Sequence, residues 1–214
     1  MTHIIKTYLA AACLALCLGL FLQAKAEAAS DARQALEKTV NQVLAELKKP
    51  ELKNPATREA VLANVERIVL TLFSFEELSM RTVGPNWKNF SQDQKTRFMN
   101  AFEDLLRERY LGALEGYNGE TVTYLKETPV GSGGDKVQID TTVDITNKAV
   151  PVNYRMLKKG NRWVVYDMII EGVGMVQNYR SQFQAVLQKG DPEELIKLVR
   201  VKADETRDAN NRKR

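Results

Sequence analysis

The amino-acid sequence predicts an α+β fold, in which helices pack on the concave side of a curved antiparallel sheet of four or five strands. Apolar residues recur at helical spacing between residues 31 and 117, and the period changes to two from residue 120 onward. Residues 163–170 are apolar except for Asp167, which is typical of a central strand buried on both faces. An acidic side chain in such a strand needs a partner.

The first 26 residues are predicted to be a secretory signal peptide rather than part of the fold. Lys6 provides a short basic region, residues 8–22 are almost wholly apolar, and Ala24-Lys25-Ala26 has the small-x-small form of a cleavage site. An apolar stretch of this length is short for a membrane span, which needs about 20 residues. The sequence therefore predicts an exported protein, with cleavage near residue 26.

Loss of this segment would remove residue types on which much enzyme chemistry depends. Cys13, Cys17 and His3 are the only cysteines and the only histidine of the chain. Without them no Ser-His-Asp or Cys-His nucleophile and no usual zinc or copper site can form. We therefore expect no catalytic residues, no metal and no cofactor. The formal net charge of +4 is modest, so nucleic acid is not an expected partner.

Four helices are predicted before the sheet. The first two, residues 31–48 and 57–73, each present one apolar face. A capping box at residues 74–77 begins a short third helix, and a second capping box at residues 91–94 opens the longest one. The longest helix is expected to reach Asn118-Gly119, a common helix stop.

The sheet is predicted as a meander with one solvent-exposed face. Alternating residues indicate strands around residues 122–124, 137–145 and 150–156, and the apolar run 163–170 is the fourth. Lys159-Gly160-Asn161 has the composition of a hairpin turn. A fifth strand pairing is left open.

Two further helices are predicted to follow the sheet. The first covers residues 175–188, and Asp191-Pro192 provides an N-cap and a first-turn proline for the second. Residues 204–214 are strongly charged, which predicts a disordered tail. The expected organisation is thus a signal peptide at 1–26, one domain at 27–203 and a tail at 204–214.

Several segments together resemble the MlaC, or toluene-tolerance, family. The most specific is the Tyr-Asp-x-x-x-Glu-Gly-Val block that begins at Tyr166. One departure is Gly174, where the family usually has serine. The segments that carry the resemblance are residues 83–88, 91–117, 163–173 and 178–183.

The resemblance implies a fold similar to the NTF2-like cone with extra helices. It also implies the periplasmic phospholipid-binding component of an ABC-type phospholipid transport system. Such a carrier would be a monomer that buries acyl tails and leaves the head group outside. It would shuttle lipid between an outer-membrane lipoprotein–porin complex and an inner-membrane transporter complex, and thereby maintain outer-membrane lipid asymmetry.

The residues expected to line the lipid site lie on the stripes that face the concave side of the sheet. About half of them are expected to be plain core, because protein interiors are mostly close-packed. The candidate lipid-binding residues are Leu78, Val83, Phe98, Phe102, Leu106, Tyr110, Tyr154, Met168, Val173 and Val176. Candidate surface charges for anionic head groups or docking partners are Arg155, Lys158, Lys159, Arg162 and Arg180, the alternative being a solvated hairpin rim.

Two other functions compete with the carrier. One is a periplasmic chaperone or assembly factor that binds apolar segments of client proteins. The other is a cone-fold isomerase or dehydratase, which needs a carboxylate base and a tyrosine donor in an apolar pocket. Asp167 with Tyr110 or Tyr154 is the one pairing that the sequence suggests for it.

Overall fold

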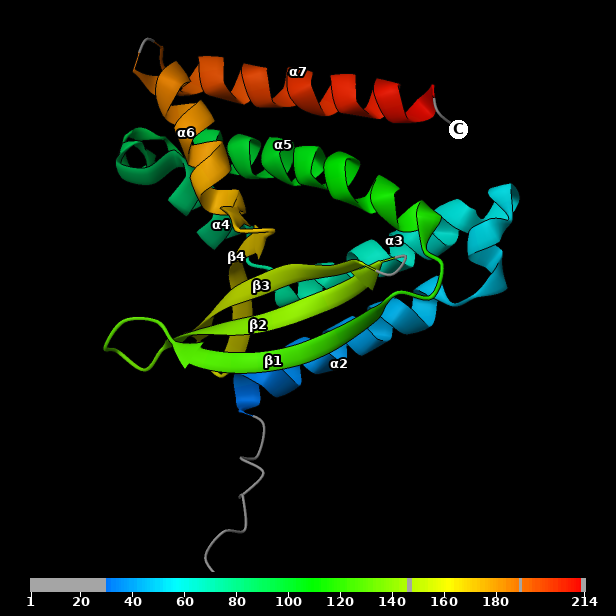
Figure 1. Cartoon of the computed structure of the whole chain (residues 1–214). Helices are drawn as coiled ribbons and strands as arrows, with labels where there is room; N and C mark the ends of the chain where they lie inside the picture. Colours follow the sequence, from blue (N-terminus) through cyan, green and yellow to red (C-terminus); the bar gives the residue numbers. More distant parts are fainter. Residues whose placement is uncertain (1–29, 146–147, 189, 213–214) are drawn as a thin grey trace, which may run out of the picture.

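The computed structural model describes residues 30–145, 148–188 and 190–212, so the predicted signal peptide lies outside the described residues. The helices are α2 (Asp31–Leu47), α3 (Pro55–Leu72), α4 (Phe75–Val83), α5 (Gln92–Tyr110), α6 (Met175–Leu187) and α7 (Pro192–Asn211). Short 3-10 turns are η1 (Pro50–Lys53), η2 (Gly84–Asn89) and η3 (Leu111–Gly116). The strands are β1 (Thr121–Pro129), β2 (Lys136–Ile145), β3 (Lys148–Lys159), β4 (Arg162–Ile170) and β5 (Val173–Gly174). Figure 1 shows α2 along the sheet, while α5, α6 and α7 stack beyond it.

The helices begin at the capping residues that the sequence contains. Ser74 Oγ accepts a hydrogen bond from the Glu77 N–H at 3.4 Å. Ser91 and Gln94 form a reciprocal capping box, with bonds of 2.9 and 3.2 Å. The carboxylate of Asp191 accepts from two backbone N–H groups in the first turn of α7. Each bond satisfies a donor that the helix itself leaves free, which fixes where α4, α5 and α7 start.

The sheet within the described residues has five strands in the order β1-β2-β3-β4-β5, and every neighbouring pair is antiparallel. The α+β prediction is confirmed, and so is the five-stranded form of the antiparallel sheet. The hairpin between β3 and β4 closes at the Lys159–Arg162 pair with Gly160 at φ 61°, a left-handed conformation that favours glycine. Similarity to the NTF2-like cone remains a prediction.

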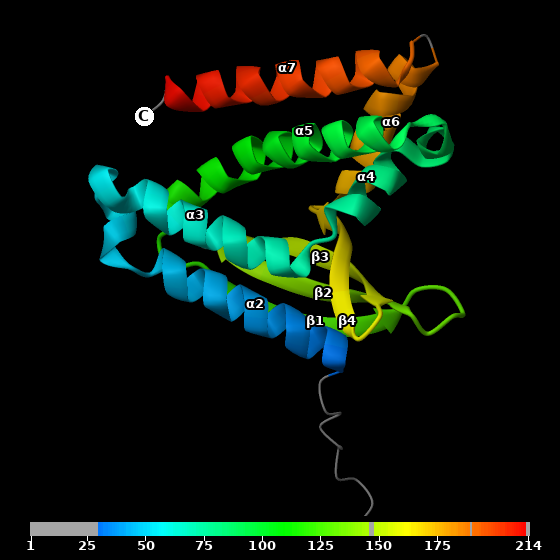
Figure 2. The ribbon, with the colours of Figure 1, turned by 180° about the vertical axis from the view of Figure 1, so that it is seen from behind.

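The first group of helices covers one face of the sheet. Figure 2 shows α2 and α3 side by side against the strands. Leu36 and Leu72 from these helices are buried with Ile139, Met156 and Val165 from the sheet. Val165 also accepts a backbone hydrogen bond from Ser74 at 3.0 Å, which anchors the end of α3 to β4. As expected for its apolar sequence, β4 is buried on both faces over residues 164–167.

The second group of helices, α4 to α7, has an aromatic core of its own. Phe98 and Phe102 of α5 stack with ring centroids 5.7 Å apart. Phe183 meets both rings edge-on, and Tyr179 meets Phe102 edge-on at 5.0 Å. Edge-to-face and offset contacts of this kind are favourable beyond the area they bury. All four residues are buried and belong to one cluster with apolar residues of α4 to α7.

Two predicted boundaries are wrong. The long helix ends at Tyr110 and continues as the 3-10 turn η3, because glycines at 112 and 116 disfavour further α-helix. Residues 204–211, predicted to be a disordered tail, are the end of α7. These residues are held against α5 by polar contacts rather than by apolar packing. Arg207 Nε lies 3.1 Å from Glu108 Oε1, and Asn210 Nδ2 donates to the Glu108 carbonyl at 2.7 Å.

Asp167 finds the partners that a buried carboxylate requires. Its Oδ1 accepts from the Val176 N–H at 3.0 Å, and its Oδ2 lies 3.4 Å from the Arg155 guanidinium. Gly174 is the N-cap of α6 and has no side chain to cap it, so Asp167 caps the helix from β4. Burial nevertheless raises the pKa of Asp167, although its hydrogen bonds and Arg155 act in the opposite direction.

We predict that the contribution of Asp167 to stability falls as pH rises. Because its pKa is raised on folding, the protonated form stabilises the native state below the unfolded pKa of about 4. This contribution is lost as pH rises through the folded pKa. The Asp167→Asn variant has no carboxylate to titrate at this position. The free energy of unfolding of the wild type, relative to that of the variant, should therefore fall between pH 3 and pH 7. Urea unfolding across that range measures it, and a constant difference would contradict the prediction.

Candidate functional site

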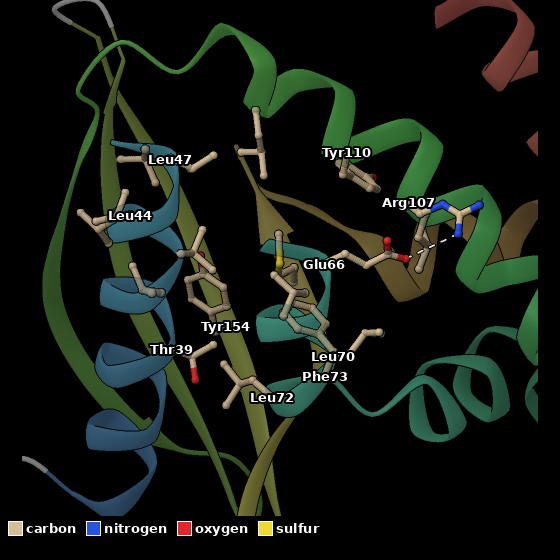
Figure 3. Close-up of a pocket in the computed structure, with 18 of the residues that line it drawn as sticks. Thr39, Leu44, Leu47, Glu66, Leu70, Leu72, Phe73, Arg107, Tyr110 and Tyr154 are labelled. Carbon is tan, nitrogen blue, oxygen red and sulfur yellow. Dashed lines mark ion pairs between the residues drawn. The ribbon is translucent and has the colours of Figure 1, made fainter. Parts of the chain in front are cut away.

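An apolar cavity of about 610 Å³ lies among α2, α3, α5 and the sheet, a volume typical of small-ligand sites. Figure 3 shows side chains from α2 and α3 pointing toward those of the strands across this space. The strand residues on its wall are Val122, Val143, Ile145, Tyr154 and Met168. Burial raises the pKa of Tyr154 to about 12, as expected for a hydroxyl beside apolar surface.

Four of the ten predicted lipid-binding residues line this cavity, namely Leu106, Tyr110, Tyr154 and Met168. The other six are placed elsewhere. Val173, the first residue of β5, is 61% exposed, and Val176 packs against the aromatic core. The remaining four, which are fully buried in the solid core of α4 to α7, are Leu78, Val83, Phe98 and Phe102.

Many of the cavity residues that the prediction missed come from α2 and α3. Both helices have the amphipathic stripe that the sequence analysis identified, so the signal was present. A stripe indicates that a face is buried, but it does not distinguish a packed neighbour from a void. The missed apolar residues on these two helices are Leu36, Val40, Val43, Leu44, Leu47, Val69, Leu70 and Leu72.

The cavity wall also carries four charged residues, and three of them, Glu66, Glu103 and Arg107, lie where α3 faces α5, whereas Glu120 precedes β1. Arg107 lies 3.5 Å from Glu66 across the two helices, and Figure 3 shows this ion pair at the side of the cavity. Glu103, one turn earlier on α5, also lines the cavity. Burial raises the pKa of Glu103, and the charge of Glu66 raises it further.

The candidate catalytic pairing does not form at the cavity. Tyr110 and Tyr154 line it, but Asp167 does not. Successive residues of a strand point to opposite faces, so Asp167 points away from the face on which Met168 meets the cavity. Its oxygens are occupied by Val176 and Arg155.

The candidate surface cations also lie outside the cavity wall. Arg155 pairs with Asp167, and Lys159 pairs with Glu76 of α4. The Arg180 guanidinium covers Gly84, where an added Cβ would be 2.7 Å from Nη2. Lys158 and Arg162 are exposed at the rim of the β3–β4 hairpin. These positions agree better with a solvated rim than with a single head-group site, and their role in docking remains a prediction.

No described helix is both long and apolar enough to cross a membrane. Among residues 30–145, 148–188 and 190–212, no group of three or more His, Cys, Asp or Glu residues is arranged to hold a metal ion.

Fold and cavity together define an α+β binding protein with an apolar pocket beside an antiparallel sheet. The family model described as "MlaC protein" matches residues 37–200, which is most of the chain. The chain belongs to the MlaC family, and the resemblance seen in the sequence is confirmed.

Individual relatives agree with this assignment. The chain is 25% identical over 145 residues to the intermembrane phospholipid transport system binding protein MlaC of Haemophilus influenzae, covering 66% of this chain and 67% of that protein. It is 23% identical over 164 residues to toluene tolerance protein ttg2D of Pseudomonas putida, covering 76% and 75%. A phospholipid-binding protein from Ralstonia solanacearum, solved in complex with a phospholipid at 1.53 Å, matches with a TM-score of 0.75 and 26% identity. This match covers 83% of this chain and 99% of that one.

The division between solid core and cavity wall can be tested by truncating one residue of each. Phe102→Ala removes a fully buried ring that contacts three others, so it should lower the free energy of unfolding by about 3–5 kcal/mol. Leu44→Ala enlarges a space that is already empty and should cost about 1 kcal/mol or less. Chemical denaturation measures both. Equal losses would contradict this division.

Proposed function

We propose that the protein is a periplasmic phospholipid carrier, not an enzyme, and that its cavity shields acyl tails from water. The observation that carries the proposal is the apolar cavity of about 610 Å³ in a chain of the MlaC family. The phospholipid complex of the Ralstonia solanacearum protein supports it, because that protein shares the fold at a TM-score of 0.75.

An apolar cavity wall is what the shielding of an acyl tail from water requires. At about 0.8 kcal/mol for each methylene group, a tail of roughly 15 carbons costs about 12 kcal/mol to expose to water. Burying it requires apolar surface rather than reactive groups, and the strands and helices around the cavity supply that surface. At about 30 Å³ for each water-sized group, the cavity has room for roughly 20 such groups, or one long acyl chain.

The cellular setting is part of the same proposal. The predicted signal peptide would deliver the chain to the periplasm as a monomer. There it would exchange lipid with an inner-membrane ABC-type transporter complex and an outer-membrane lipoprotein–porin complex, and so help to maintain outer-membrane lipid asymmetry. The name of the Haemophilus influenzae relative, an intermembrane phospholipid transport system binding protein, supports this setting.

The proposal predicts that phospholipid co-purifies with the protein and that filling the cavity expels it. Val143 lines the cavity from β2 and belongs to none of the packed core clusters. The Val143→Trp variant should therefore retain at least about five-fold less phospholipid with little loss of stability. Organic extraction followed by mass spectrometry measures the lipid, and thermal unfolding measures the stability.

A matched control comes from the same strand. Thr142 points to the opposite face of β2, so Thr142→Trp should leave the bound lipid unchanged. Wild-type protein that carries no phospholipid and takes up none from vesicles would overturn the carrier. Capture of unfolded apolar peptides instead would then favour the chaperone alternative.

A further inference from the structure

Among the described residues of the cavity wall, one hydroxyl group has no hydrogen-bond partner. Four of these residues carry a hydroxyl, namely Thr39, Tyr110, Tyr117 and Tyr154. Thr39 and Tyr117 each donate to a backbone carbonyl, at 3.0 and 3.4 Å respectively. Tyr110 is hydrogen-bonded to Tyr179. The hydroxyl of Tyr154 forms no hydrogen bond with any described residue, although it faces an otherwise apolar space.

A second unpartnered hydroxyl, that of Tyr124, lies near the first. Tyr124 of β1 is two residues from the cavity-lining Val122, so it projects from the same face of the sheet. Its ring and that of Tyr154 pack against the same buried cluster. The Tyr124 hydroxyl is fully buried, and no described residue bonds to it. Burial is the main cause that raises its pKa, and a charge on Tyr154 would raise it further. Both phenols therefore stay protonated as hydrogen-bond donors.

Two neighbouring donors without an acceptor indicate a place where an acceptor oxygen binds. Buried hydroxyl groups in folded proteins are nearly always hydrogen-bonded, because an unpaired one costs free energy. An isolated water molecule would meet few partners here, since a buried water usually makes about three hydrogen bonds and the surrounding wall is apolar. An oxygen attached to an apolar chain fits this position better, because the chain fills the apolar space while the oxygen meets the hydroxyl.

We propose that Tyr154 determines specificity inside the cavity by donating a hydrogen bond to an acceptor oxygen on an acyl chain. Tyr124 is a positioning residue, because its hydroxyl can donate to the Tyr154 oxygen and leave the Tyr154 O–H free for the lipid. The acceptor is the ester carbonyl at the head of the chain or a hydroxyl along it, which share this chemistry. The inference rests on the proposed function and deepens it, because it names the kind of chain that the carrier prefers.

Competition between lipids that differ by one oxygen tests the preference. In the first experiment the protein takes up lipid from vesicles with equal amounts of diester and diether phosphatidylcholine of the same chain length. In the second experiment the vesicles contain diether phosphatidylcholine with and without a hydroxyl group on one chain. Mass spectrometry of the bound lipid should give a ratio of about five in favour of the lipid with the additional oxygen in at least one experiment, the size expected for one hydrogen bond.

Tyrosine-to-phenylalanine variants remove the hydroxyl and keep the ring. Tyr154→Phe should bring the ratio close to one, and Tyr124→Phe should lower it about two-fold, because the donor itself remains. Neither variant should lower thermal stability, since neither hydroxyl has a partner among the described residues to lose. The matched control Tyr166→Phe alters a buried tyrosine of β4 that lies outside the cavity wall, and it should leave the ratio at its wild-type value.

The possible results separate this inference from the proposed function. Equal uptake of the competing lipids in both experiments, or a ratio that Tyr154→Phe leaves unchanged, would overturn the role of Tyr154 and leave the carrier intact. Uptake of none of the lipids would overturn the carrier itself. A preference that Tyr154→Phe abolishes and Tyr166→Phe retains supports the proposal. If it occurs in the first experiment, the acceptor is the ester carbonyl, and if it occurs in the second, a chain hydroxyl is accepted.

Discussion

The whole structure depends on two adjoining apolar regions, an aromatic core and a cavity, which share Leu106 and Met175. Apolar side chains in water tend to close any space between them, because contact removes surface from solvent. Here the aromatic rings of α5 and α6 interlock at 5.0–5.7 Å and form the centre of the cluster that holds the second helix group together. The stability that this solid region provides allows α2 and α3 to be held against the sheet around a space that side chains leave empty.

The junction between sheet and α6 fixes how these regions meet. After β4 the chain reverses through Glu171 and Gly172, both with positive φ. Glu171 is unusual in this conformation, since left-handed angles are strained for most residues with a Cβ. The reversal brings the start of α6 back to Asp167, which caps it through Val176. Met175 thus reaches the cavity wall while Tyr179 and Phe183 reach the aromatic core, so one helix joins both regions.

Much of the fold could be predicted from the sequence, and the site only in part. Alternation along β2 and β3, the hairpin at Gly160 and the capping boxes are local signals, and the structure follows them. The cavity depends on tertiary distances that no local pattern contains. Phe102 and Leu44 lie on equally convincing apolar stripes, yet one is enclosed by rings and the other faces a void. The end of α7 was missed for a related reason, because its partner Glu108 lies about a hundred positions earlier in the sequence.

The character of the wall also constrains how a lipid could leave. In the proposed carrier, moving a buried acyl tail into water costs about 12 kcal/mol of free energy. Release of the lipid into solvent would therefore be extremely slow. Transfer must instead deliver the tail directly to another apolar surface, which requires a partner or a membrane to approach the cavity opening. Exposed apolar residues that also line the cavity, Leu70 on α3 and Ile145 at the end of β2, lie on such a route.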